Sequence, residues 1–221
     1  MRASLAGQYW LSVEDDVAWV VATVESRFDS VVELRRMDNG ESISLSEEEF
    51  AKLLPVTSDP TASVDDLVRM NDVNAGALLE NLRLRYNKDE IFTTIGPGML
   101  ITVNPYKPLA ICSAEHMSAM KDAPNPEALP PHIFKLAQSA YSRMLQSVTA
   151  QSILVSGESG AGKTEATKLC MACLAEISGS SGESTEAALE SGILLEAIGN
   201  AKARRSSPAA RSALVAPRPV E

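Results

Sequence analysis

The chain has 221 residues, a formal net charge of −9 and 45% apolar residues. This length allows one domain and part of a second, and the apolar content is typical of a globular protein rather than a disordered one. An acidic chain lacks the basic surface that binds a phosphate backbone, so we expect no nucleic acid partner. The sequence holds no run of about 18 or more apolar residues, so we predict no transmembrane segment.

Two features favour a reducing, cytoplasmic compartment. The N-terminus reaches Glu14 without the apolar stretch of a signal peptide. The three cysteines are too few, and odd in number, for a disulfide scaffold. Cys170 and Cys173 have no further ligands at metal-binding spacing, so we expect both to pack in a core. We assign no catalytic role to His116 or His132.

Short apolar and β-branched runs dominate residues 17–56. The runs at 17–26 and 30–37 precede Asp38-Asn39-Gly40, and another run follows at 42–45. An Asn-Gly pair between such runs favours a hairpin, because glycine tolerates the positive φ that the turn requires. We predict a small β-barrel over residues 13–56. The alternative is a β-hairpin appendage that packs on something larger.

Helical signals follow. Ser63 and the acids after it predict one helix start, and Asn74 predicts another. Residues 91–103 predict two short strands interrupted at 95–98. Residues 133–148 carry an apolar stripe at helical spacing, which we expect to be core. The helix after Asn74 carries a comparable face formed by Leu78, Leu79, Leu82 and Tyr86.

The pattern changes at Thr149. The continuous apolar run at 152–155 predicts a strand buried on both faces, followed by a glycine-rich turn and a helix that begins near Lys163. Residues 187–198 predict a second helix. Residues 203–221 combine prolines with scattered arginines and no periodicity, so we predict a disordered tail.

The glycine-rich turn carries the strongest chemical signal in the chain. Its residues fit G-x-x-x-x-G-K-[ST], the phosphate-binding loop. The glycines let successive N–H groups point inward, and the following helix adds the positive end of its dipole. The lysine would reach the β- and γ-phosphates, and the threonine hydroxyl would ligate Mg²⁺. The predicted nucleotide-binding residues are Gly157, Glu158, Ser159, Gly160, Ala161, Gly162, Lys163 and Thr164.

Four stretches resemble one family. GESGAGKTEATK (157–168), preceded by QSILVS (151–156), resembles the phosphate loop of myosin heavy-chain heads. Residues 82–107 resemble the stretch that leads into the myosin purine-binding loop. Residues 130–141 resemble the helix before the phosphate loop, and 194–202 the segment that leads toward switch I. The resemblance covers about residues 13–202.

The resemblance implies an α/β P-loop NTPase fold, here an incomplete myosin head core. It implies an SH3-like barrel over residues 13–56 and the N-terminal part of the motor domain over 57–202. It also implies ATP and Mg²⁺ as ligands, an actin filament as partner, actin-activated ATPase activity, and a cytoplasmic, cytoskeletal location.

Individual residues carry over by the same resemblance. Asn104, Pro105 and Lys107 fall on purine-loop positions around the adenine, and Asn200 falls at the approach to switch I. Cys112 stands where the family usually has a tyrosine, which implies a looser base site.

The resemblance ends after Lys202. Pro208 stands where the family has an asparagine, and Ala209 and Ala210 replace two serines that help position water and Mg²⁺. No aspartate follows Asp122, although P-loop NTPases use an acidic residue on a later strand to hold Mg²⁺. We therefore expect the chain alone to bind ATP weakly or not at all, without actin-activated turnover. The alternatives are a truncated, non-catalytic nucleotide-binding or interaction module, and an unrelated P-loop ATPase or kinase.

Overall fold

The computed structural model describes residues 7–14, 18–123, 125 and 128–179. The described residues up to Ser178 belong to one compact unit, Met1–Ser178, whereas Gly179 is the first residue of a second unit. The predicted helix at 187–198, the predicted tail at 203–221 and Asn200 lie outside the described residues. Among the described residues, no helix has the length and apolar character needed to cross a membrane.

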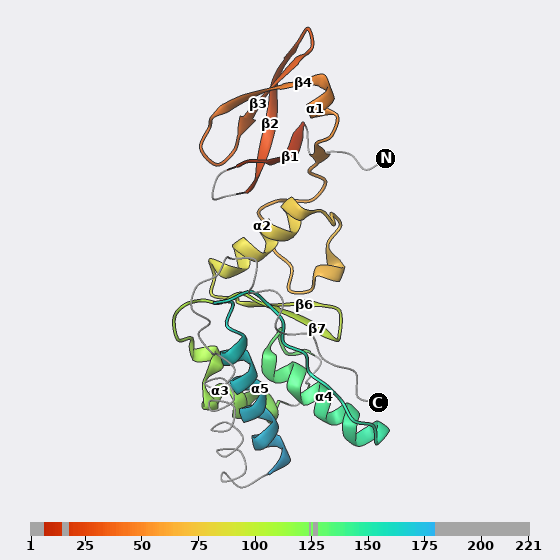
Figure 1. The fold of residues 1–221 in the computed structure, drawn as a ribbon, viewed down its shortest axis with the longest axis vertical. Helices are drawn as coiled ribbons and strands as arrows, with labels where there is room; N and C mark the ends of the chain where they lie inside the picture. The colour runs from red at the N-terminus through yellow and green to blue at the C-terminus, as the bar shows by residue number, and fades with distance from the viewer. Residues whose placement is uncertain (1–6, 15–17, 124, 126–127, 180–221) are drawn as a thin grey trace, which may run out of the picture. The chain divides into compact units, whose positions relative to one another are not determined.

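Five strands form one antiparallel sheet at the N-terminal end (Figure 1). Their order is β4-β3-β2-β1-β5, and the strands are β1 (Gln8–Ser12), β2 (Trp19–Phe28), β3 (Val31–Arg36), β4 (Ser42–Ser46) and β5 (Leu54–Pro55). The sheet begins before residue 13. It stays open where the sequence predicted a barrel, because β5 is only two residues long and Pro55 has no N–H to extend the ladder.

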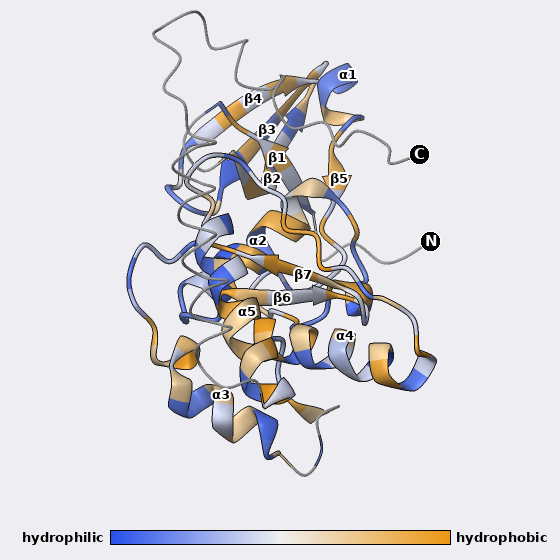
Figure 2. Ribbon diagram, turned by 60° about the horizontal axis from the view of Figure 1, so that its bottom comes forward, coloured by the Kyte–Doolittle hydropathy of each residue, from blue (hydrophilic) through white to orange (hydrophobic). Residues whose placement is uncertain are grey.

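Alternation along the strands explains how this sheet buries one face. In β3, Val32, Leu34 and Arg36 are buried while the residues between them are exposed, and Figure 2 shows hydrophobic and hydrophilic positions mixed along these strands. The predicted turn at 38–40 is present, with Gly40 at φ +75°. The Arg36 guanidinium donates to both carboxylate oxygens of Asp38 at 3.0 and 2.7 Å and thereby lowers the pKa of that carboxyl.

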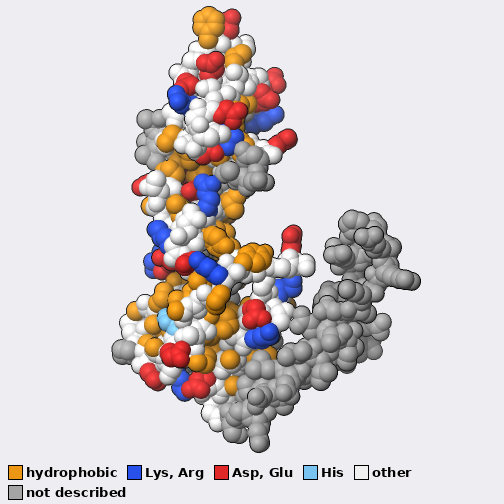
Figure 3. All heavy atoms as spheres, turned by 90° about the vertical axis from the view of Figure 1, so that its left-hand side faces the viewer, with side chains coloured by type: hydrophobic (Ala, Val, Ile, Leu, Met, Phe, Trp, Pro, Cys, Tyr) orange, Lys and Arg blue, Asp and Glu red, His pale blue; other side chains and the backbone are white. Residues whose placement is uncertain are grey.

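The outer positions of the sheet carry ion pairs. Figure 3 shows acidic and basic side chains close together on this part of the surface. Arg27, near the end of β2, pairs with Glu47 in the short helix α1 (Glu47–Phe50), and Arg35 pairs with Glu25 at 3.2 Å. Both pairs are largely exposed, so solvent screens them and each adds little to stability.

Helix α2 (Ala75–Tyr86) begins as predicted, with Asn74 accepting a hydrogen bond from the Ala77 N–H. Of the apolar face, Leu79 is exposed, whereas Leu78, Leu82 and Tyr86 are half-buried. The fully buried positions are Gly76, Ala77, Asn81 and Arg85. Asn81 and Arg85 are buried because they satisfy polar backbone groups of neighbouring segments.

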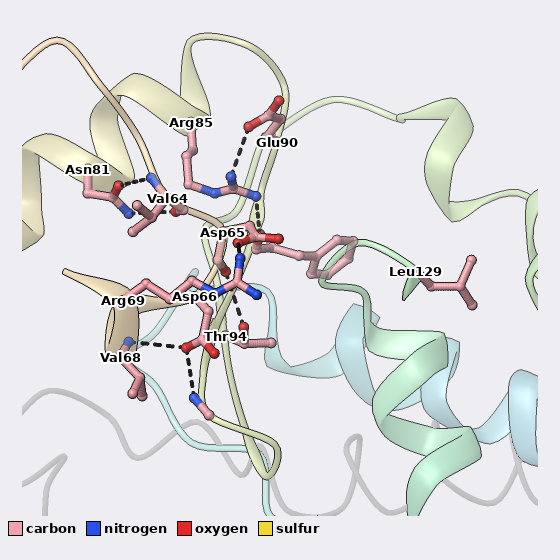
Figure 4. A network of polar contacts seen from close by, with 12 residues as sticks. Val64, Asp65, Asp66, Val68, Arg69, Asn81, Arg85, Glu90, Thr94 and Leu129 are labelled. Atoms are coloured by element: carbon pink, nitrogen blue, oxygen red, sulfur yellow. Dashed lines mark hydrogen bonds and ion pairs between the residues drawn. The ribbon is translucent and has the colours of Figure 1, made fainter. Parts of the chain in front are cut away.

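The predicted helix start at Ser63 is also wrong. The only helical turn nearby is a 3-10 helix, η1 (Leu67–Arg69), which Asp66 caps by accepting from Val68 N at 3.1 Å. Residues before it are held in other ways. The Asn81 side chain binds both backbone groups of Val64, and the Asp65 carbonyl accepts from the N–H and hydroxyl of Thr94 (Figure 4).

The two strands predicted within 91–103 are confirmed as a hairpin of β6 (Phe92–Ile95) and β7 (Met99–Thr102). The Asp66 carboxylate accepts from Gly96 N in its turn at 2.9 Å. The buried Arg85 guanidinium pairs with Glu90 at 3.0 Å (Figure 4). It also donates to Thr93 Oγ1 and to the Phe92 carbonyl. The hairpin is therefore fastened to both η1 and α2.

Three helices and a 3-10 turn complete the described unit: η2 (Ala110–Cys112), α3 (Ala114–Lys121), α4 (Ile133–Ser147) and α5 (Lys163–Ser178). Helices α4 and α5 pack against each other (Figure 1). Their core includes Phe92, Ile133, Phe134, Cys170 and Cys173, and the prediction that the two cysteines pack is confirmed.

The second half of the α4 stripe is not core. Ile133, Phe134 and Ala137 are buried, but Met144 and Leu145 are exposed. The predicted strand at 152–155 is also absent, because these residues pair with no other described strand, and Leu154 is 91% exposed. An open cavity of about 640 Å³ lies there, lined by residues that include Tyr141, Met144, Ile153, Met171 and Leu174.

His132 joins the start of α4 to η2. It is buried, its Nδ1 accepts from Phe134 N at 3.1 Å, and its Nε2–H donates to the Ile111 carbonyl at 2.9 Å. Burial, with a smaller contribution from nearby His116, lowers the pKa of His132 from 6.5 to about 4. The role is structural, since protonating Nδ1 would remove the helix cap.

We predict that Gly76→Ala destabilises the chain. Alanine normally favours a helix over glycine by about 1 kcal/mol, but a Cβ here would lie 2.7 Å from Trp10 Cε3. Overpacking should lower the free energy of unfolding by about 1–3 kcal/mol, measured by urea denaturation. Gly98→Ala is the control, because no atom lies within 4 Å of its Cβ position. A stabilised Gly76→Ala chain would contradict this packing.

We also predict that His132 makes stability depend on pH. Its folded pKa is depressed from 6.5 to about 4, so the unfolded chain binds more protons in that range and stability falls as pH drops through it. The loss approaches about 3 kcal/mol by pH 4. His132→Asn keeps a capping acceptor but should flatten this slope, whereas His116→Asn should retain it. Equal slopes in both variants would contradict the prediction.

Candidate functional site

The glycine-rich turn connects the irregular segment 151–156 to the first residue of α5. Gly160 and Gly162 have φ values of +82° and +91°, a conformation that strains any residue with a Cβ. At Gly157 a Cβ would lie 3.1 Å from Ala161 Cβ. The backbone path thus favours glycine at each of these three positions, and we call the turn over residues 157–162 the cradle.

Lys163 closes this cradle. Its Nζ donates to the carbonyls of Gly157 and Glu158, both at 2.8 Å. Within the loop, Ala161 N also donates to the Glu158 carbonyl at 3.2 Å. The ammonium therefore lies across the loop, where a phosphate oxygen could replace these carbonyl oxygens as its hydrogen-bond acceptor.

The start of α5 adds directed amides to the same place. The first helical hydrogen bond runs from Ala166 N to Gly162 O at 2.9 Å. The amides of the first turn before Ala166 therefore take no part in the helical hydrogen bonds and point toward the loop. Thr164, the second residue of α5, is exposed at this end. Further along, Lys168 pairs with Glu165 at 2.7 Å, on a separate part of the helix surface.

Asn104, one of the predicted purine-loop residues, contacts the phosphate loop directly. Its Nδ2 donates to the Gly160 carbonyl at 2.7 Å, and its Oδ1 accepts from Tyr106 N at 3.0 Å. Tyr106 Oη donates to the same Gly160 carbonyl at 3.3 Å. Sequence reasoning missed Tyr106, although its position within Asn-Pro-Tyr-Lys was a signal that could have found it.

The other predicted base-site residues lie nearby but point elsewhere. Lys107 forms an ion pair with Asp89 at 2.6 Å, in which both side chains are about half exposed. Pro105 is half-buried next to Asn104. Cys112 is half-buried in η2, and burial raises the pKa of its thiol. Asn200 lies outside the described residues.

Both cysteines of α5 are buried. Burial raises the pKa of Cys173 to about 11 and also raises that of Cys170. Cys173 Sγ donates to the Phe134 carbonyl at 3.7 Å. Within the part of the chain that the structure describes, no cluster of three or more histidine, cysteine or acidic residues could hold a metal ion.

We predict that Gly162→Ala loosens the loop. A Cβ at φ +91° costs on the order of 1–3 kcal/mol, and the loop can relieve this strain by opening without unfolding α5. Amide hydrogen exchange should accelerate across 157–162 and stay unchanged in the middle of α5. Gly98→Ala, at a glycine without positive φ, is the control. Unchanged exchange in the loop would show that the left-handed conformation is not required.

Comparisons with known proteins match this chain to one family. The model of the myosin head (motor domain) matches residues 64–212, well over half of the chain, and continues past Lys202, where we expected the resemblance to end. The high molecular weight form of myosin-1 from Acanthamoeba castellanii is 41% identical over 77% of this chain and 11% of its own length. Myosin-11 from Arabidopsis thaliana is 39% identical over 91% of this chain and 13% of its own length.

A third relative agrees. Myosin IA heavy chain from Dictyostelium discoideum is 43% identical over 67% of this chain and 15% of its own length. The chain thus spans between about a tenth and a seventh of these three relatives. A match of this extent excludes the alternative of an unrelated P-loop ATPase or kinase.

Proposed function

Because the chain belongs to the myosin head family, we propose that it forms the ATP-binding part of a motor that moves along actin filaments. The phosphates of ATP would lie in the loop of residues 157–164, and the base near residues 104–107. The proposal extends to a cytoplasmic, cytoskeletal location, to an actin partner, and to the absence of a nucleic acid partner. The open N-terminal sheet would be the counterpart of the SH3-like subdomain of many myosins.

The observation that carries this proposal is the place of Lys163. Its ammonium lies 2.8 Å from two loop carbonyls, at the positive end of α5. Charge-assisted hydrogen bonds to phosphate oxygens are stronger than the neutral contacts that they would replace. An incoming triphosphate could therefore draw Lys163 from the carbonyls of Gly157 and Glu158 without changing the backbone path.

The donor set at the start of α5 also fits Mg²⁺ bound to a nucleotide. Thr164 supplies the hydroxyl that this type of loop offers to the ion, and it is exposed at the loop. When bound, Mg²⁺ would neutralise charge on the β- and γ-phosphates. The chain's own residues hold and orient the triphosphate, and the irregular segment before the loop leaves this part of the site open to water.

The remaining predicted parts are proposals of the same kind. Residues 13–56 and 57–202 would correspond to the N-terminal subdomain and the first part of the motor core. Asn200 would lie at the approach to switch I. The 221-residue chain by itself would bind Mg-ATP weakly and would not turn it over, since no aspartate follows Asp122.

We predict that Lys163→Ala weakens Mg-ATP binding at least about 10-fold, because a charge-assisted contact worth 1.5–3 kcal/mol is lost. Amide chemical shifts of the loop, followed during titration with Mg-ATP into the millimolar range, give the affinity. Lys168→Ala is the matched control on the same helix and should bind like wild type. An unchanged affinity in Lys163→Ala would contradict the site.

Two further results, one from an ATP hydrolysis assay and one from this titration, are decisive. Multiple ATP turnovers by the wild-type chain, lost in Lys163→Ala, would contradict the expected lack of hydrolysis. A folded wild-type chain that binds no Mg-ATP would favour the alternative of a non-catalytic interaction module.

A further inference from the structure

We propose that Asn104 and Tyr106 are positioning residues for the phosphate loop, which hold the Gly160 carbonyl and so orient the amide of Ala161. The resemblance placed Asn104 at the adenine, whereas the contacts described above commit its carboxamide to the loop. The inference rests on the proposed nucleotide site and assigns these two side chains a role toward phosphate rather than base.

Both donors converge on one oxygen. The Gly160 carbonyl accepts from Asn104 Nδ2 at 2.7 Å and from Tyr106 Oη at 3.3 Å. A carbonyl oxygen has two lone pairs, so these contacts use its full capacity. Asn104 Oδ1 accepts from Tyr106 N at 3.0 Å, which ties the two positioning residues to each other.

Holding this carbonyl determines where the next amide points. The peptide unit is planar and trans, so the Gly160 C=O and the Ala161 N–H point in opposite directions. The Ala161 N–H donates to the Glu158 carbonyl, the oxygen that also receives Lys163 Nζ. The two positioning residues are thereby connected, through one peptide plane, to the groups that would meet a phosphate.

The loop has few other supports. Gly160 and Gly162 both adopt left-handed conformations, and glycine loses more conformational entropy on ordering than any other residue. The preceding segment has no strand partner among the described residues. The Asn104 side chain lies 3.6 Å from the Cβ position of Gly162, so it also packs along the outside of the turn.

The segment that carries Asn104 and Tyr106 is anchored to the hairpin, and Tyr106 adopts a strained backbone conformation. Asn104 follows β7, whose hairpin is fastened by Arg85 and Asp66. Tyr106 is held at φ +52° and is 81% exposed, so burial does not explain its placement. Its hydroxyl contact with Gly160 and its N–H contact with Asn104 offset that strained conformation.

The test compares two ligands that differ by the nucleoside. Wild-type chain and Asn104→Ala are titrated with Mg-ATP and with Mg-tripolyphosphate, which has no base. If Asn104 positions the loop, both affinities should fall by the same factor, about 3- to 10-fold for one lost hydrogen bond. Tyr106→Phe, which removes only the hydroxyl contact, should weaken both ligands equally and less. Asn87→Ala, at the exposed C-terminus of α2, is the control and should bind both like wild type.

A ligand-free measurement separates this inference from the proposed function. Amide exchange in Asn104→Ala should accelerate at Ala161 and Gly162 and stay unchanged in the middle of α5, a local effect that general destabilisation would not produce. Loss of ATP affinity with unchanged tripolyphosphate affinity would overturn the inference and make Asn104 a base-reading residue. Unchanged exchange would overturn it as well. A wild-type chain that binds neither ligand would contradict the proposed function, and the exchange result would still decide the role of Asn104.

Discussion

The buried guanidinium of Arg85 is the contact on which the arrangement around the loop depends. It donates to Thr93 Oγ1 at 2.9 Å and to the Phe92 carbonyl at 2.8 Å, and it pairs with Glu90. A charge taken out of water is tolerated only when its donors are satisfied. These contacts couple α2 to the β6–β7 hairpin, whose far end leads directly to Asn104.

The same hairpin links the sheet-bearing part of the chain to the helical core. On one side, α2 packs on the N-terminal sheet through the close approach of Gly76 to Trp10. On the other side, Phe92 lies in the core of α4 and α5 and contacts the His132 ring. The phosphate loop itself begins α5, so it is supported from the helical core and, through Asn104, from the hairpin.

Most sequence patterns with a local cause predicted the structure well, and the helix start at Ser63 is the exception. Asn74 caps α2, Gly40 and the β6–β7 turn lie where glycine signals placed them, and α5 begins at Lys163. Patterns that depend on a distant partner failed. The apolar run at 152–155 forms no strand among the described residues, since an apolar run becomes a strand only where another strand pairs with it. Leu79 and Met144 are exposed because helical periodicity identifies an apolar face without showing what covers it.

The sequence by itself determined the family and the position of the proposed phosphate loop, because glycines, lysine and threonine at fixed spacing act within eight consecutive residues. Only the tertiary structure decided which atoms the purine-loop residues contact. Asn104 and Gly160 are 56 residues apart, and no local preference specifies their hydrogen bond. That contact exists because Arg85 and Asp66 hold the hairpin beside the start of α5, and a contact between distant segments depends on the packing of everything between them.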